Sequence, residues 1–262
     1  MQTPLTYYGG KQTMLKHIRP LVPPHTLYCE PFAGGAALFF DKEPAKVNVI
    51  NDLNAELITF YRVLAVCPED FKALVRQTLH SREQHVQAWH IYNHPSFFTD
   101  AQRAWAVWVL SKQGFGGQFS ASFGFDKSGG KKHKKVQNAK SILENRDMQS
   151  LLEQATVECD DALAVIRRYD CPEAFHFIDP PYVGSNMAHY AGMFNERSLI
   201  ELLDLCTALK GKFMLTMYPN ETIREYAAKY GWHIHEVERQ ISACKAEHRR
   251  RQVEWMVINY AV

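Results

Sequence analysis

The chain has 262 residues, enough for one large α/β domain with an insertion or for two small domains. Hydrophobic residues make up 46% of it and charged residues 22%, so a packed core can form and global disorder is excluded. The sequence has no apolar run of about 18 residues and no signal-peptide pattern, so we expect a soluble cytoplasmic protein without a membrane partner.

The cysteines and histidines do not form a metal-binding pattern. The six cysteines contain no C-x-x-C pair, which argues against structural zinc and against a disulfide scaffold. The histidines at positions 80, 85, 90 and 94 do not share one helical face, and no H-E-x-x-H motif occurs. We predict that the protein holds no metal.

Positive charge is concentrated in two segments, although the formal net charge is only +2. Residues 112–140 contain seven lysines and one aspartate, and residues 239–251 carry a net charge of +4. The rest of the chain is net acidic. This distribution indicates a polyanionic partner such as nucleic acid.

An α/β pattern covers both ends of the chain. The first 60 residues predict strands at 26–29 and 47–50, with a glycine-rich turn and a helix from residue 36 between them. The pattern resumes after residue 150, with strands expected at 174–178, 212–217, 232–238 and 252–259 and helices at 195–209 and 220–229. We predict one α/β sheet of the Rossmann-like class.

Residues 58–150 show helical periodicity without matching strands and predict a helical insertion. Thr99 or Asp100 is expected to cap a helix that ends at Gly114. Residues 115–125 alternate aromatic and small side chains, which predicts a hairpin or an ordered loop. The lysines that follow lie beside Gly129 and Gly130, so we expect them in a flexible, hydrated loop.

The tetrapeptide Asp179-Pro180-Pro181-Tyr182 directly follows an expected strand. Two consecutive prolines stiffen the turn, which presents the Asp179 carboxylate and the Pro180 carbonyl as two fixed acceptors beside an aromatic ring. An exocyclic amino group with two N–H donors complements this pair, and its planar ring can stack on Tyr182. The alternative is an ordinary loop stiffened by proline.

A second motif, residues 30–35, contains Phe32, Gly34 and Gly35. The glycines permit a tight turn and a close approach of the backbone to a ligand. Asp52 follows at the end of the next strand, where an acid can accept hydrogen bonds from ribose hydroxyls. Asp52 could instead cap the helix that begins near residue 53.

A third motif, Tyr7-Tyr8-Gly9-Gly10-Lys11, lies near the N-terminus. Composition alone favours a surface turn, although Lys11 could pair with a ligand carboxylate.

These motifs, with Asn51-Asp52 between the second and the tetrapeptide, resemble in order those of the Dam-like (D12 class) adenine-N6 DNA methyltransferases. Residues 239–242 and 254–260 also resemble the closing hairpin of that family. The resemblance implies an S-adenosylmethionine-dependent methyltransferase sheet formed by residues 1–57 and 151–262, with a target-recognition domain at 58–150. It implies a bacterial or phage enzyme that acts on double-stranded DNA at the nucleoid. The oligomeric state, monomer or weak dimer, is left open by the sequence.

The resemblance also assigns roles to individual residues. S-adenosylmethionine would be held by Tyr7, Lys11, Phe32, Gly34, Gly35, Asp52, Asp161 and Asp179. Asp52 would bind the ribose of the cofactor, and Asp161, or its neighbour Asp160, would lie near the adenine of the cofactor. The catalytic group would be Asp179, Pro180, Pro181 and Tyr182. The Asp179 carboxylate and the Pro180 carbonyl would accept both hydrogens of the target amine while Tyr182 stacks on the flipped base.

The basic segments and the aromatic stretch provide the expected DNA contacts: Lys112, Gln113, Phe119, Ser120, Lys127, Lys131, Lys132, Lys134, Lys135, Arg249, Arg250 and Arg251. The sequence departs from the family where Tyr7-Tyr8 replaces the Trp-Ala of many relatives. It also departs at residues 243–248, which lack the Ser, Asn and Gly often found there.

The main alternatives keep the cofactor and change the acceptor to cytosine N4, an RNA adenine or a protein glutamine. A further alternative is a DNA-binding protein that has lost activity. The sequence contains no convincing nuclease motif, and it does not specify a recognition sequence or a partner restriction nuclease.

Overall fold

The computed structural model describes residues 3–127, 132–183, 194–240 and 251–262. The chain forms two compact units, each built from three segments. The first unit contains residues 1–13, 34–44 and 52–159, and the second contains residues 14–33, 45–51 and 160–262.

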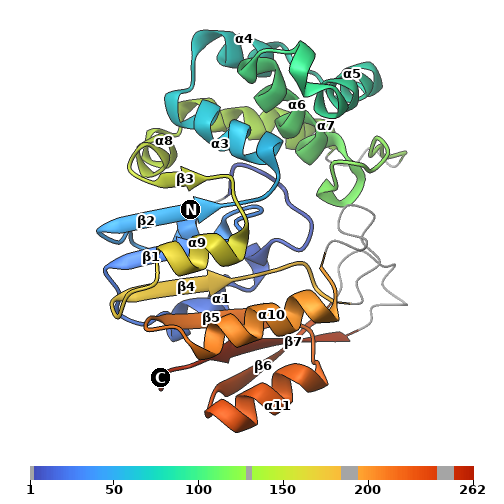
Figure 1. Cartoon of the computed structure of the whole chain (residues 1–262). Helices are drawn as coiled ribbons and strands as arrows, with labels where there is room; N and C mark the ends of the chain where they lie inside the picture. Colours follow the sequence, from blue (N-terminus) through green and yellow to red (C-terminus); the bar gives the residue numbers. More distant parts are fainter. Residues whose placement is uncertain (1–2, 128–131, 184–193, 241–250) are drawn as a thin grey trace. The chain divides into compact units, whose positions relative to one another are not determined.

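The second unit contains a sheet whose strands follow the order β2-β1-β4-β5-β7-β6 (Figure 1). Its strands are β1 (Leu27–Glu30), β2 (Val47–Asn51), β4 (Ala174–Ile178), β5 (Lys212–Met217), β6 (His233–Gln240) and β7 (Arg251–Ile258). The first four in spatial order are parallel, whereas β7 runs antiparallel to both β5 and β6. Strands β4 and β5 are almost entirely buried, as their mainly apolar sequences predict.

Helices of the second unit cover this sheet. They are α1 (Leu15–Ile18), the 3₁₀ turn η2 (Arg19–Leu21), α9 (Ala162–Arg168), α10 (Glu196–Thr207) and α11 (Glu221–Tyr230). Figure 1 shows α9, α10 and α11 on one face of the strands. Apolar side chains of α10 belong to the same core cluster as Phe213, Leu215 and Trp255. The side chains of Asn195 and Asn220 cap α10 and α11, which confirms both predicted helix starts.

The first unit is mainly helical. Its helices and turns are η1 (Lys11–Thr13), α2 (Ala37–Asp41), α3 (Ala55–Val66), α4 (Glu69–Gln77), α5 (Arg82–Asn93), η3 (Pro95–Phe97), α6 (Asp100–Gln113), η4 (Phe115–Gly117), α7 (Lys132–Ala139), η5 (Lys140–Glu144) and α8 (Arg146–Glu153). It also contains the short strand β3 (Thr156–Glu158). The central helix is α6, which packs against α3, α4, α5 and α7. It begins with a capping box between Thr99 and Gln102 and ends at Gly114, as predicted.

The lysine-rich segment differs from the prediction. We expected a loop, but Lys132, Lys134 and Lys135 belong to helix α7. Val136 in this helix is 2% exposed, so the segment is anchored by an apolar contact that a count of charges does not reveal.

The boundaries of the compact units also differ from a simple insertion. The N-terminal residues and residues 34–44, which belong to the α/β pattern in sequence, group with the helices of the first unit. The assignment of target recognition to residues 58–150 remains a prediction.

Candidate active site

The carboxyl ends of β1, β2, β4 and β5 lie at one edge of the sheet, because these strands are parallel and in register. Asp179 directly follows β4, and Tyr218 directly follows β5. The predicted tetrapeptide therefore lies at the sheet edge where an open α/β fold binds its ligands.

The Asp179 carboxylate is held from the neighbouring strand. The hydroxyl of Thr216, a fully buried residue of β5, donates a hydrogen bond of 2.6 Å to Asp179 Oδ1. Asp179 itself is half-buried and Pro180 is buried. The carboxylate is thus fixed on the protein side while part of the residue stays accessible.

The Tyr182 ring is anchored at its hydroxyl, which donates a hydrogen bond of 2.5 Å to Glu254 Oε1. Glu254 is fully buried in β7. The ring also meets Tyr218 edge to face, with the centroids 4.4 Å apart and the planes at 82°. Burial, followed by the negative charges of Asp179 and Glu254, raises the pKa of Tyr182 well above its usual value, so the phenol keeps its proton.

Asn51, at the end of β2, ties together the loops at this edge of the sheet. Its side-chain amide donates to the carbonyls of Pro31 and Asp160, and its side-chain oxygen accepts from the Asp160 N–H. Phe32, one of the residues predicted to hold the cofactor, meets Phe194 edge to face, with the ring centroids 6.3 Å apart.

Asp160 and Asp161 have local partners. The Asp161 carboxylate accepts from the Ala164 N–H and caps α9, whereas Asp160 forms an ion pair of 2.8 Å with Arg168. Of the two, the exposed Asp161 is not engaged in an ion pair among the described residues. This difference supports keeping Asp161 as the candidate cofactor contact.

In the first unit, the glycine turn is closed by Asp52. Asp52 Oδ2 accepts a hydrogen bond of 2.9 Å from the Gly34 N–H, and Oδ1 accepts from the Asn54 N–H. The Gly34 carbonyl accepts from the Tyr61 hydroxyl at 2.6 Å. Burial raises the pKa of the Asp52 carboxyl, and the two backbone N–H groups act in the opposite direction. Asn54, not Asp52, caps α3, so the helix-cap alternative for Asp52 is wrong.

Tyr7 packs on the same turn. Gly34 has a φ of +47°, and a Cβ added there would lie 2.9 Å from Tyr7 Cε1. A Cβ at Gly35 would lie 3.0 Å from Tyr7 Cβ. The third motif is therefore part of a packed unit, and Lys11 is buried with its ammonium donating to the Gly9 carbonyl. The surface-turn alternative is correct for Tyr8 and Gly9, which form an exposed turn, whereas Tyr7 is half-buried and Lys11 is buried.

Three of the expected DNA contacts are buried within the first unit. Lys112 is 8% exposed and Phe119 is 5% exposed, and the Phe119 ring meets Tyr7 edge to face. The buried Gln113 side chain donates to the Leu79 carbonyl and accepts from the Ser81 N–H. Burial, followed by the charge of Lys135, lowers the pKa of Lys112 to about 7.

The other expected DNA contacts lie at the surface or beyond the described residues. Lys127, Lys134 and Ser120 are exposed, and Lys135 is half-buried. Lys131, Arg249 and Arg250 lie outside the described residues, as do the side chains of Lys132 and Arg251.

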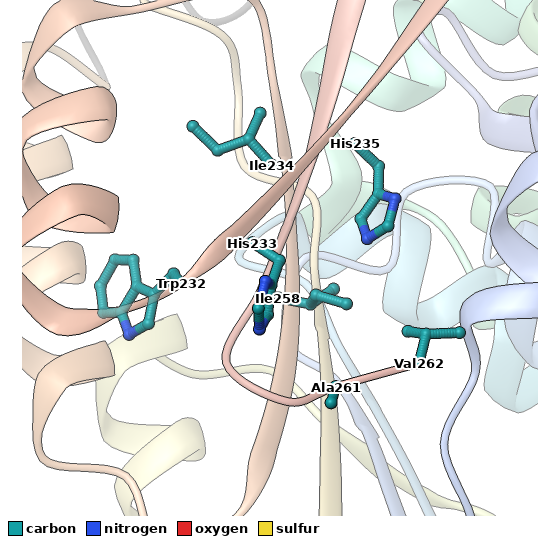
Figure 2. Close-up of a pocket in the computed structure, with 7 residues that line it drawn as sticks. All are labelled: Trp232, His233, Ile234, His235, Ile258, Ala261 and Val262. Carbon is teal, nitrogen blue, oxygen red and sulfur yellow. The ribbon is translucent and has the colours of Figure 1, made fainter.

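A pocket of about 480 Å³ lies elsewhere in the second unit, between β6, the end of β7 and the C-terminal residues (Figure 2). It is lined by Trp232, His233, Ile234, His235, Ile258, Ala261 and Val262. None of the predicted catalytic or cofactor residues lines it, so it is not the candidate active site.

Among the described residues, no group of three or more His, Cys, Asp or Glu side chains could hold a metal ion. Within the same residues, no helix is both long and apolar enough to span a membrane.

A family model for the D12 class of N6 adenine-specific DNA methyltransferases matches residues 7–242. The chain belongs to this family and is an adenine-specific DNA methyltransferase. Its mostly parallel sheet and flanking helices fit the Rossmann-like methyltransferase fold. Adenine N6 in DNA is the acceptor of the family, which decides against cytosine N4, RNA adenine and protein glutamine.

The individual proteins that the chain resembles are also named as methyltransferases. The chain is 27% identical to the type II methyltransferase M1.LlaDCHI of Lactococcus lactis subsp. cremoris, over 96% of this chain and 93% of the relative. It is 25% identical to the type II methyltransferase M.CviBI of Paramecium bursaria Chlorella virus NC1A, over 90% of this chain and 93% of that protein. It is 26% identical to the DNA N-6-adenine-methyltransferase of Escherichia phage P1, over 92% of this chain and 33% of that protein.

The residues that support the predicted site are mostly not recognisable in the sequence. Thr216 and Tyr61 carried no recognisable pattern, because a single hydroxyl in an apolar segment looks like an ordinary core position. Glu254 offered a signal, since it is an acid next to the apolar run Trp255-Met256-Val257-Ile258.

Proposed function

We propose that the protein transfers the methyl group of S-adenosylmethionine to N6 of an adenine that is flipped out of double-stranded DNA at a specific sequence. The observation that carries this proposal is the Asp179 carboxylate, which directly follows a parallel strand, is fixed by Thr216 and is succeeded by two prolines.

The nucleophile, the N6 amine of adenine, becomes reactive only when its two N–H bonds are held in a suitable orientation. The lone pair of adenine N6 is delocalised into the ring until both N–H bonds are held by acceptors. The Asp179 carboxylate and the Pro180 carbonyl are two such acceptors, and their rigid attachment means that little reorganisation is needed at the moment of reaction. The anchored Tyr182 ring offers a stacking surface for the extruded base, and such stacking contributes about 1–3 kcal/mol.

The first unit offers groups suited to the cofactor. Each Asp52 oxygen accepts one backbone hydrogen bond and can accept a second from a ribose hydroxyl. Gly34 and Gly35 leave no room for a side chain beside Tyr7, and a turn without side chains lets a ligand approach its backbone closely. S-adenosylmethionine supplies an electrophilic methyl sulfonium when bound. Tyr7, Lys11, Gly34, Gly35 and Asp52 of this unit are candidates to hold it. Phe32, Asp161 and Asp179 of the second unit are the other candidates.

DNA binding is proposed to rest on the exposed lysines of the first unit and on the basic segment that includes Arg249, Arg250 and Arg251. Phosphate contacts from such residues position the protein without reading sequence. Lys112, Gln113 and Phe119 then support the DNA-binding surface from inside the unit, since their side chains are buried.

The proposal is tested by supplying methyl-labelled S-adenosylmethionine with double-stranded DNA, single-stranded DNA or RNA of the same sequence. We expect label in double-stranded DNA at a rate at least tenfold higher than in the other two acceptors. Equal labelling of RNA, or no labelling of any DNA, would contradict the proposal.

A further inference from the structure

Two fully buried polar side chains, Thr216 and Glu254, lie behind the candidate active site of the second unit. Thr216 is in β5 between Leu215 and Met217, both of which belong to the apolar cluster under α10. Glu254 is in β7, one residue before Trp255, which pairs with Met217 at the end of β5. A buried hydroxyl and a buried carboxylate in such surroundings lower the stability of the fold unless each forms a hydrogen bond.

Each of the two side chains forms a hydrogen bond, and the residue at the other end of each bond is a candidate catalytic residue. Thr216 donates to Asp179 Oδ1 at 2.6 Å, and Glu254 Oε1 accepts from the Tyr182 hydroxyl at 2.5 Å. The two contacts come from different strands and reach the first and the last residue of one tetrapeptide. The prolines between these residues already limit the backbone, so the remaining freedom is mainly rotation of the Asp179 and Tyr182 side chains.

We propose that Thr216 and Glu254 are positioning residues for methyl transfer. Thr216 fixes the rotation of the Asp179 carboxylate, and Glu254 fixes the Tyr182 ring, so that the receptor for the target amine is preformed before DNA binds. The inference rests on the proposed function, because it assumes that Asp179 and Tyr182 contact the flipped adenine.

A positioning role predicts a specific kinetic pattern. Loss of the Thr216 hydroxyl removes one hydrogen bond that orients the Asp179 carboxylate, which lowers the rate of the chemical step but leaves the cofactor contacts in place. Loss of the Tyr182–Glu254 hydrogen bond removes one contact that orients the stacking ring, which weakens the hold on the extruded base.

The first test uses Thr216→Val, which removes the hydroxyl at nearly constant volume, and Thr216→Ser, which keeps it. We expect Thr216→Val to lower kcat at least tenfold with the Kd for S-adenosylmethionine and the KM for DNA within threefold of wild type. Thr216→Ser should recover kcat to within threefold. Thr207→Val is the matched control, because Thr207 is exposed and its hydroxyl donates to the Asp204 carbonyl, far in sequence from the tetrapeptide.

The second test is a double-mutant cycle on Tyr182→Phe and Glu254→Gln. If the two side chains act through one hydrogen bond, the double variant should lose no more of kcat/KM than the stronger single variant. Tyr226→Phe is the matched control, because the Tyr226 hydroxyl donates to another carboxylate, that of Asp204, at 2.6 Å. The cycle stands without Thr216→Val should that variant fail to fold, since Tyr182→Phe removes a single oxygen atom.

The outcomes separate the two proposals. A wild-type protein that methylates no DNA overturns the proposed function. An active wild type with Thr216→Val within twofold of its kcat, or with Thr216→Ser as impaired as Thr216→Val, overturns the positioning role of Thr216. Fully additive losses in the cycle overturn the role of Glu254.

Discussion

The Tyr7 ring lies against Gly34 so closely that a Cβ at this glycine would be 2.9 Å from Tyr7 Cε1. Gly34 also has a φ of +47° and donates its N–H to Asp52 Oδ2 at 2.9 Å. The two motifs that contain Tyr7 and Gly34 therefore pack together as one structure, and the Asp52 carboxylate closes the turn at Gly34.

The first prediction concerns Gly34→Ala. The new methyl group must displace Tyr7, and the positive φ adds strain of about 1–3 kcal/mol, so we expect a lower free energy of unfolding and at least tenfold weaker binding of S-adenosylmethionine. Calorimetry and chemical denaturation measure both effects. Gly231→Ala is the control, because Gly231 has a φ of +71° with nothing within 4 Å of an added Cβ. Equal cofactor binding by wild type and Gly34→Ala would show that the turn does not approach the cofactor.

Asp52→Ala removes the acceptor that closes the turn, and Asp52→Asn keeps one oxygen in place. If Asp52 also binds the ribose, both variants should weaken cofactor binding, by about 1.5–3 kcal/mol for the alanine variant. Calorimetric titration with S-adenosylmethionine measures the loss. Asp70→Ala is the control, because Asp70 is an exposed aspartate that also accepts from a backbone N–H. An unchanged Kd in both Asp52 variants would leave Asp52 with a purely structural role.

The sequence predicts these motifs but not their packing. The glycines, Asp52 and the tetrapeptide are recognisable because each has a local chemical reason for its residue types. The contact of Tyr7 with Gly34 joins residues 27 positions apart through a side-chain fit, and no periodic pattern reports such a fit. The helix that contains Lys132 was not predicted for a related reason. Val136 is its main apolar residue, and one apolar residue indicates a buried helix face only when the tertiary contact that buries it is known.

Lys112 predicts an unusual dependence of stability on pH. Burial lowers the pKa of its amine from 10.5 to about 7 in the folded state. Between these two values the unfolded chain binds more protons than the folded one, so stability rises with pH across this window. Lys112→Met should therefore stabilise the protein by about 1–3 kcal/mol at neutral pH, and the gain should shrink towards pH 10. Urea unfolding at several pH values measures this change. A gain that is constant with pH would mean that the Lys112 amine stays charged in the folded state.

The lysines around helix α7 are predicted to bind phosphates without reading sequence. Replacing Lys131, Lys132, Lys134 and Lys135 with Gln preserves helix propensity and removes the charge. We expect weaker binding to all DNA sequences, and a salt dependence that flattens by about 0.9 units of slope for each phosphate that the variant no longer neutralises. Binding titrations across a salt series test this. Replacing the exposed Lys210 and Lys229 with Gln serves as the control. An unchanged slope, or weaker binding restricted to one sequence, would rule out general phosphate binding by these lysines.

The most direct test of the account is the modified nucleoside in DNA from cells that express either the wild-type protein or Asp179→Ala. Wild type should produce N6-methyladenine, detected by mass spectrometry of the nucleosides and located at one recurring sequence by single-molecule sequencing. Asp179→Ala should raise the activation free energy of methyl transfer by at least about 3 kcal/mol, because a preorganised acceptor for the amine is removed, while cofactor binding stays measurable. Turnover of Asp179→Ala within tenfold of wild type, or N4-methylcytosine in place of N6-methyladenine, would contradict the assignment of Asp179 as the residue that holds the adenine amine.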